Sequence, residues 1–132
     1  MSVERVNPGE LAAPRGFSHA VVGRGTVVFL AGQTALDGGG RIVGETLPEQ
    51  FRQALTNLLV ALRAAGGEPG GLASITVYIT DVEDYKARAR EIGAIWRELV
   101  GRDYPAMAGI GISRLWDAEA KVEIQGFAVI DG

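Results

Sequence analysis

The sequence contains no cysteine and only one histidine, His19. Without cysteine, the chain can form no disulfide, no thiolate nucleophile and no cysteine-based metal site. A metal site with several histidine ligands is excluded as well, because one chain supplies only one. Gly109-x-Gly111 lacks the remainder of a dinucleotide-binding motif. We therefore expect neither a metal ion nor an organic cofactor.

Positive charge is also scarce. The chain has 13 Lys and Arg residues against 16 Asp and Glu, a net charge of -3, whereas affinity for phosphate backbones comes mainly from clustered basic side chains. The nearest basic cluster, Lys86, Arg88 and Arg90, is interleaved with apolar positions and is typical of a solvated helix face. We expect no nucleic-acid partner.

Long hydrophobic runs are missing too. The apolar stretches are far shorter than the roughly 20 residues of a membrane span, and residues 1–8 have neither a basic leader nor the apolar core of a signal peptide. We expect no membrane segment and a cytoplasmic location. With 132 residues, 47% of them hydrophobic, and no linker or repeat, the chain predicts a single domain over residues 1–132.

Periodicity predicts two helices and several strands. The first helix begins at a Thr46-x-x-Glu49 capping box, continues with apolar residues at helical spacing and ends at Gly66-Gly67. The second helix is expected over residues 81–100. Strands are expected near residues 3–7, 18–22, 26–31, 42–43, 75–79, 106–113 and 121–128. This order predicts an α+β fold, a mixed sheet with two helices packed on one face.

The glycine-rich strand over residues 106–113 is the most unusual segment. Its alternation places the alanines and isoleucines on one face, which we expect to be core, and Met107, Gly109 and Gly111 on the other. We expect this second face to be open, like the face that carries Glu123 and Gln125 in the following strand. An open apolar face on a small domain indicates self-association.

Six segments follow one another in a distinctive combination: Phe17-Ser18-His19-Ala20-Val21, Ala31-Gly32-Gln33, residues 53–58, residues 74–81, Tyr104-Pro105-Ala106 and Val122-Glu123-Ile124. Together they resemble the Rid (reactive intermediate deaminase, YjgF-like) family over nearly the whole chain. The resemblance implies a chorismate-mutase-like fold and a homotrimer whose sheets line a central barrel, with ligand clefts between neighbouring subunits. It also implies an enamine/imine deaminase, a hydrolase that converts intermediates such as 2-aminoacrylate to a keto acid and ammonia.

The sequence departs from the family pattern at three positions. Active members hold the substrate carboxylate with an arginine directly after Pro-Ala, and Met107 stands there. Phe17 replaces a common tyrosine, and Ala31 replaces the serine of Ser-Gly-Gln. Glu123 matches the glutamate that positions or activates water, and Arg114 matches a common arginine. The resemblance thus implies a site that keeps its water-handling half and lacks its carboxylate-binding half.

These assignments leave alternatives open. Glu123 is either the catalytic residue or a partner of Arg114 or Lys121 in an interface salt bridge. Met107 either contacts the ligand or plugs the cleft, and Arg114 either binds an anion or is an ordinary surface arginine. His19 is interpreted as structural, because its neighbour Ser18 points to the other face of a strand. The substrate-binding candidates are Phe17, Ala31, Gly32, Gln33, Met107, Arg114 and Gln125.

The leading functional hypothesis is a homotrimer that acts on small imine, enamine or carbonyl compounds by water-mediated C–N hydrolysis. Its substrate specificity is expected to be non-standard, because Met107 replaces the carboxylate-binding arginine. The alternative is a non-catalytic trimer that binds a small ligand or has a regulatory role. RNA cleavage, which the resemblance also brings with it, is disfavoured by the acidic charge balance.

Overall fold

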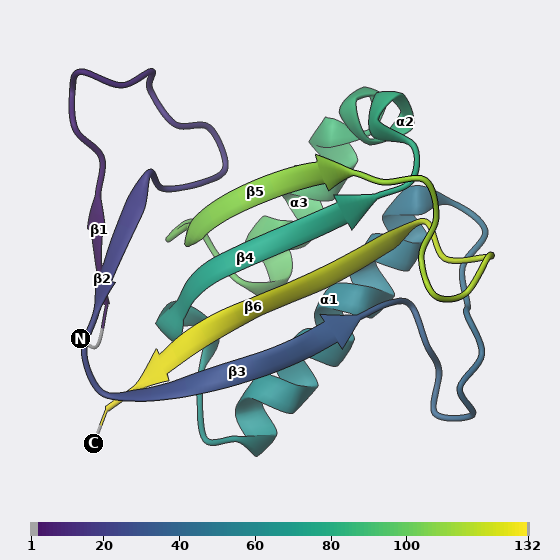
Figure 1. The fold of residues 1–132 in the computed structure, drawn as a ribbon, viewed down its shortest axis with the longest axis horizontal. Helices are drawn as coiled ribbons and strands as arrows, with labels where there is room; N and C mark the ends of the chain where they lie inside the picture. Colours follow the sequence, from purple (N-terminus) through teal and green to yellow (C-terminus); the bar gives the residue numbers. More distant parts are fainter. Residues whose placement is uncertain (1–2, 132) are drawn as a thin grey trace.

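The computed structural model describes residues 3–131 and shows a four-stranded mixed sheet with helices on one face, beside a separate two-stranded hairpin (Figure 1). Met1 and Ser2, which belong to the N-terminal segment in which no leader is predicted, lie outside these residues. The elements are β1 (Val3–Val6), β2 (Ala20–Gly23), β3 (Thr26–Gln33), α1 (Leu47–Ala64), the 3-10 turn η1 (Pro69–Gly71), β4 (Leu72–Ile79), α2 (Val82–Ala87), α3 (Ala89–Leu99), β5 (Ala106–Gly111) and β6 (Val122–Ile130). Within residues 3–131, no helix is both long and apolar enough to cross a bilayer.

The sheet has the strand order β3-β6-β4-β5, in which β4 and β5 are parallel and the other pairs are antiparallel. The predicted α+β class is therefore confirmed. Residues 42–43 form no strand of their own, and Ile42 makes only an isolated bridge with Leu36. The strand predicted from residue 18 begins at Ala20 instead, because Ser18 pairs with Ala106 beside β5.

Helix α1 forms where its capping box predicts it. The Thr46 hydroxyl accepts a hydrogen bond from the Glu49 amide at 3.3 Å, and the Glu49 carboxylate accepts one from the Thr46 amide at 3.1 Å. The helix ends before Gly66, whose φ of 94° is favourable only for glycine. Its buried face, which includes Phe51, Leu55, Leu58 and Leu62, packs on the sheet.

The second predicted helix is divided in two. Arg88 has φ -101° and ψ 12°, so the chain leaves helical geometry between α2 and α3. Neither proline nor glycine marks this break, and the sequence pattern therefore continues through it. Ile92, Ile95 and Trp96 of α3 are buried in the core that α3 shares with α1 and the sheet.

The predicted faces of β5 are wrong. Strand β5 pairs in parallel register with β4, which places Met107, Gly109 and Gly111 beside the buried Ile75, Val77 and Ile79 on the helix-covered face. The residues expected in the core lie on the opposite face instead, where Ile110 is 41% exposed.

Of the glycines of β5, Gly111 makes room for helix packing, whereas Gly109 does not meet a helix. A Cβ at position 111 would lie 2.8 Å from Cγ2 of Val82, at the start of α2. At Gly109 the nearest contact of an added Cβ would be the Ile79 side chain at 3.7 Å. The bare backbone at Gly111 therefore faces the start of α2, and both glycines remain exposed on this edge strand.

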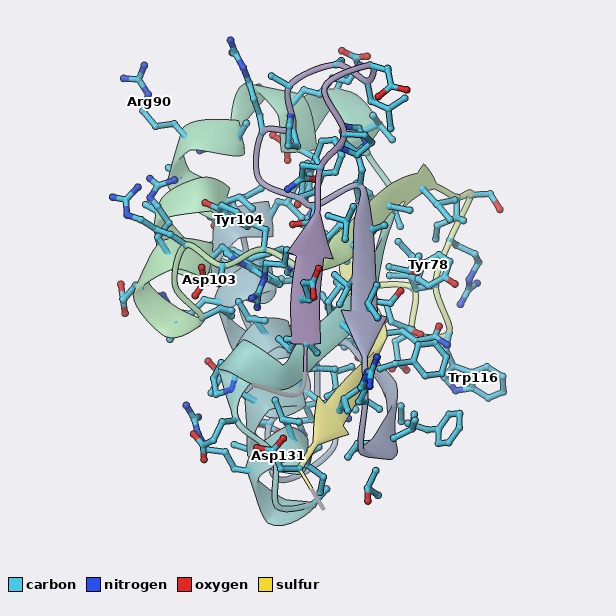
Figure 2. The ribbon with its side chains drawn as sticks, turned by 90° about the vertical axis from the view of Figure 1, so that its left-hand side faces the viewer. Tyr78, Arg90, Asp103, Tyr104, Trp116 and Asp131 are labelled. Carbon is cyan, nitrogen blue, oxygen red and sulfur yellow. The ribbon has the colours of Figure 1, made fainter. Side chains whose placement is uncertain are left out.

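The other face of the sheet is open in the single chain and carries the side chains predicted for it from β3, β4 and β6. Phe29 is 77% exposed and packs edge-on against Phe127, with ring centroids 5.4 Å apart. Tyr78 and Trp116 also project on the side away from the helices (Figure 2). An apolar face of this kind indicates a partner surface, and self-association stays a prediction.

Candidate functional site

A cavity of about 400 Å³ opens on the helix-covered side of the sheet, between α3, β5 and the loop at residues 15–17. Its walls are largely aromatic, from Phe17, Phe51, Tyr85, Trp96 and Tyr104, and Met107 lines it from β5. Two exposed arginines, Arg15 and Arg97, also border it. Cavities of this volume commonly hold small ligands.

Hydrogen bonds fasten the Phe17 loop to the start of β5. The Ser18 hydroxyl donates to the Tyr104 carbonyl at 2.7 Å, and the Ser18 amide donates to the Pro105 carbonyl at 2.9 Å. His19 faces elsewhere: its Nε2 lies 2.7 Å from the Ala12 carbonyl oxygen, and its ring meets Phe17 edge-on. Ser18 and His19 therefore do not form a nucleophile–base pair, which confirms the prediction that they point in different directions.

The polar groups of the cavity wall are hydrogen-bond donors. Burial raises the pKa of Tyr85 to about 12, so its phenol stays protonated at neutral pH. Trp96 is 4% exposed, and its indole Nε1 finds no hydrogen-bond partner within residues 3–131. Buried donors are usually paired, so a polar atom of a bound molecule would satisfy the indole.

Glu123 and Gln125 lie on the open face, where β6 pairs Glu123 with Tyr78 and Gln125 with Thr76 of β4. The Glu123 carboxylate rests directly over Gly32: a Cβ at position 32 would overlap its Oε2. Glu123 is half-buried, and in the described part of the chain no side chain or amide binds its carboxylate. No salt bridge joins Glu123 to Arg114 or Lys121 within the described chain. The predicted alternative, a salt bridge across a subunit interface, stays a prediction.

Two sequence-predicted binding residues lie apart from Glu123. An irregularity in β3 between Leu30 and Gln33 pairs Gln33 with Ile124, and Gln33 lines a separate hollow with Gln53 and Asn57 of α1. Arg114 donates to the carbonyls of Leu115 and Trp116 at 3.0 and 3.1 Å. This arginine stabilises its own loop.

The candidate site therefore consists of two halves on opposite faces of the sheet. Phe17 and Met107 belong to the cavity, whereas Ala31, Gly32, Glu123 and Gln125 belong to the open face. Sequence patterns alone did not indicate the cavity residues of α3, which have the spacing of an ordinary core stripe. One signal was available: Gly93 interrupts a good helix sequence four residues before Arg97.

Known proteins match the chain over most of its length. The family model described as Endoribonuclease L-PSP matches residues 8–130. The 2-iminobutanoate/2-iminopropanoate deaminase of Salmonella typhimurium is 30% identical over 105 residues, which make up 80% of this chain and 80% of that protein. A RutC family protein of Pyrococcus horikoshii is 30% identical over 116 residues, 87% of this chain and 88% of that protein.

Solved structures have the same fold. A Rid family protein from Yersinia pestis, YyfB, described as of unknown function, superposes with a TM-score of 0.86 and 32% identity, over 98% of this chain and 100% of that chain. The E. coli protein TdcF, solved with bound serine, superposes with a TM-score of 0.71 and 28% identity, over 95% of this chain and 94% of that chain.

Proposed function

The chain belongs to the Rid (YjgF-like) family, the family of the matching Endoribonuclease L-PSP model, and we propose that it is a homotrimeric hydrolase of small imines or enamines. Relatives that carry the name 2-iminobutanoate/2-iminopropanoate deaminase support the reaction class. The solved relative with bound serine supports a ligand of amino-acid size.

The observation that carries the proposal is the unpaired Glu123 carboxylate held over the Gly32 backbone. A half-buried carboxylate without a cation partner is free to accept a proton from water. Gly32 supports this arrangement, because any larger residue would displace the carboxylate. Gln125 lies two residues further along the same face of β6 and can orient a water molecule or ligand beside it.

The second half of the site comes from a neighbouring subunit. Met107 and Phe17 face the helices, and Glu123 faces away from them, so one ligand cannot contact both sets on one chain. Association through the exposed Phe29 and Phe127 covers the open face and brings Glu123 towards another subunit. The proposed cleft therefore lies between the aromatic cavity of one subunit and Glu123 of the next.

The proposed reaction is hydrolysis of a C=N bond. Glu123 accepts a proton while the water oxygen attacks the iminium carbon, which produces a carbinolamine. Glu123 then returns this proton to the nitrogen, and the C–N bond breaks as the hydroxyl oxygen forms the carbonyl. Ammonia leaves and takes up the hydroxyl proton as ammonium, so water plus iminium yields carbonyl plus ammonium. Glu123 ends in its starting state.

Met107 changes the specificity of this chemistry. A thioether cannot form the bidentate hydrogen bonds that hold a carboxylate. We propose that the substrate either lacks the usual α-carboxylate or presents it to a different side chain. Substitution Met107→Arg tests this point: a gain of activity on 2-aminoacrylate would indicate that the rest of the cleft is intact.

The test of the proposed reaction is ammonia release from imines generated by an amino-acid oxidase at neutral pH. Glu123→Gln should lower the rate above the spontaneous background by about 100-fold or more, whereas Glu83→Gln on exposed α2 should leave it unchanged. A wild-type rate equal to background on charged and neutral imines would overturn the hydrolase. If a small ligand still raised the melting temperature, the non-catalytic binding trimer would replace it.

A further inference from the structure

Arg97 occupies an unusual position on α3. A Cβ added to Gly93 would lie 3.1 Å from Nη1 and 4.0 Å from Cζ of Arg97. The guanidinium therefore lies back along the helix, over the bare backbone of Gly93, where both residues border the aromatic cavity. Glycine is unfavourable inside a helix, and space for this guanidinium is a local reason for its presence.

The Arg97 guanidinium has no anionic partner. Arg52, Arg63 and Arg88 of the helices form ion pairs with acidic side chains. Within the described chain, no acidic residue pairs with Arg97 or with Arg90, and of these two only Arg97 borders the cavity. None of the residues that line the cavity is an aspartate or glutamate. The N–H donors of the planar Arg97 guanidinium are therefore available to the carboxylate of a bound molecule.

The cavity walls favour a large apolar group. Five aromatic side chains and Met107 line the cavity, and Trp96 stacks on Tyr104 with ring centroids 6.5 Å apart and an interplanar angle of 20°. A two- or three-carbon ligand would leave most of this surface uncovered, whereas an aromatic ring gains from contact with such walls. A volume of about 400 Å³ also exceeds the need of the smallest imino acids.

From these three features we propose that the cavity binds a carboxylate that carries an aromatic or similarly large apolar group. Arg97 binds the carboxylate at the border of the cavity, and the apolar group lies between Trp96 and Met107. Arg97 thus replaces, from a different element, the carboxylate anchor that is missing at position 107. The extension to catalysis rests on the proposed hydrolase, so the substrate would be the imine of an aromatic amino acid; the binding itself does not depend on it.

Tryptophan fluorescence provides a direct binding test. The sequence has two tryptophans; Trp116 is 90% exposed and Trp96 lines the cavity, so Trp116→Phe leaves a single reporter at the site. The probes are 3-phenylpropanoate, propanoate, and the neutral 3-phenylpropanamide. We expect 3-phenylpropanoate to change the Trp96 emission and to bind at least about tenfold tighter than propanoate. Calorimetry on the natural chain repeats the comparison without the substitution.

Substitution of Arg97 distinguishes the contribution of its charge to binding from the contribution of the cavity shape. Arg97→Gln should weaken 3-phenylpropanoate binding by about fivefold to tenfold and should change 3-phenylpropanamide binding by less than about twofold. Arg90→Gln is the matched control, because Arg90 lies on the same helix and projects away from the molecule (Figure 2). Equal losses for the acid and the amide, equal affinity for propanoate, or no saturable binding of either phenyl probe would each overturn the proposal.

Kinetics distinguish this inference from the proposed hydrolase. A D-amino-acid oxidase generates the imines of D-phenylalanine and D-alanine in situ. We expect at least about tenfold higher kcat/KM for the phenylalanine-derived imine and a raised KM for it in Arg97→Gln. Selective binding of 3-phenylpropanoate without turnover of either imine would contradict the proposed hydrolase but support the proposed carboxylate-binding cavity. Equal turnover of both imines, unchanged in Arg97→Gln, would support the proposed hydrolase but contradict carboxylate binding by Arg97.

Discussion

Met107 and Glu123 lie on opposite faces of the same sheet, on β5 and β6, with β4 between the two strands. Met107 lines the aromatic cavity under the helices, and Glu123 lies over Gly32 on the open face. A ligand that contacts both side chains would therefore need two copies of the chain, as in the proposed intersubunit cleft.

This arrangement predicts complementation between two inactive variants. Met107→Trp fills the cavity and Glu123→Gln removes the proton acceptor, so each homotrimer should be inactive. In randomly mixed trimers, about a quarter of the clefts combine a natural cavity with a natural Glu123 from the neighbour. The measurement is imine hydrolysis by differently tagged, co-expressed subunits. Activity no higher than the sum of the two separate variants would mean that both halves come from one chain.

Gly32→Ala should displace the Glu123 carboxylate, the proposed proton acceptor, without unfolding the chain. The added Cβ would overlap the end of a partly exposed, flexible side chain, so Glu123 can rotate away. We expect kcat to fall about tenfold or more and the melting temperature to change little. Gly38→Ala is the matched control, because an added Cβ there meets nothing within 4 Å. If kcat stays unchanged in Gly32→Ala, the observed carboxylate position has no role in catalysis.

Gln50 links α1 to the segment that precedes β6. Its side chain is 1% exposed, donates to the carbonyls of Gly44 and Glu119 at 3.1 Å each, and accepts from the Lys121 amide at 2.8 Å. Gln50→Leu leaves these groups without their partner, so the free energy of unfolding should fall by about 2 to 4 kcal/mol. Denaturant titration measures this change.

A neighbouring glutamine provides the control for this prediction. Within residues 3–131, Gln53 forms one side-chain hydrogen bond, to Oδ1 of Asn57 at 2.9 Å. Gln53→Leu should therefore cost about 1 kcal/mol or less. Similar losses for the two variants would contradict a special role of Gln50 in anchoring the start of β6.

Because the Tyr85 phenol is buried, we expect the folded chain to lose stability at high pH. Burial raises its pKa from 10.0 to about 12 in the folded chain. Between these two values the unfolded chain releases the phenolic proton first, so the free energy of unfolding falls as the pH rises, by at most about 2 to 3 kcal/mol. Below pH 10 this contribution is fully present.

Tyr85→Phe should remove this part of the pH dependence. The measurement is the melting temperature of both chains between pH 9 and about pH 12. The natural chain should show the steeper decline, and an equally steep decline in Tyr85→Phe would assign the effect to other groups.

Much of the fold follows from local sequence signals. Thr46 and Glu49 cap α1 as their spacing predicts, and alternation in β4 separates Ile75, Val77 and Ile79 from the polar side chains of the open face. These features depend on neighbours within one turn or one strand, which a sequence contains directly. The resemblance to the Rid family added the family and the chorismate-mutase-like fold, because six segments occur in order over nearly the whole chain.

Only part of the candidate site could be predicted from the sequence. Alternation correctly grouped Glu123 with Gln125, but it did not show that Gly32 lies under the carboxylate, because that contact joins β3 to β6. The helix α3 residues Trp96 and Arg97 border the cavity through tertiary packing, and their spacing alone is that of a core helix.

The sequence by itself determined the helix and strand types, the family and the absence of a carboxylate-binding arginine at position 107, because each depends on residue identity and short-range order. Only the tertiary structure decided which face of β5 meets the helices. Alternation divides a strand into two sets of residues but does not say which set is buried. Parallel pairing with β4 and the packing of Val82 against Gly111 turned Met107 inward, away from Glu123.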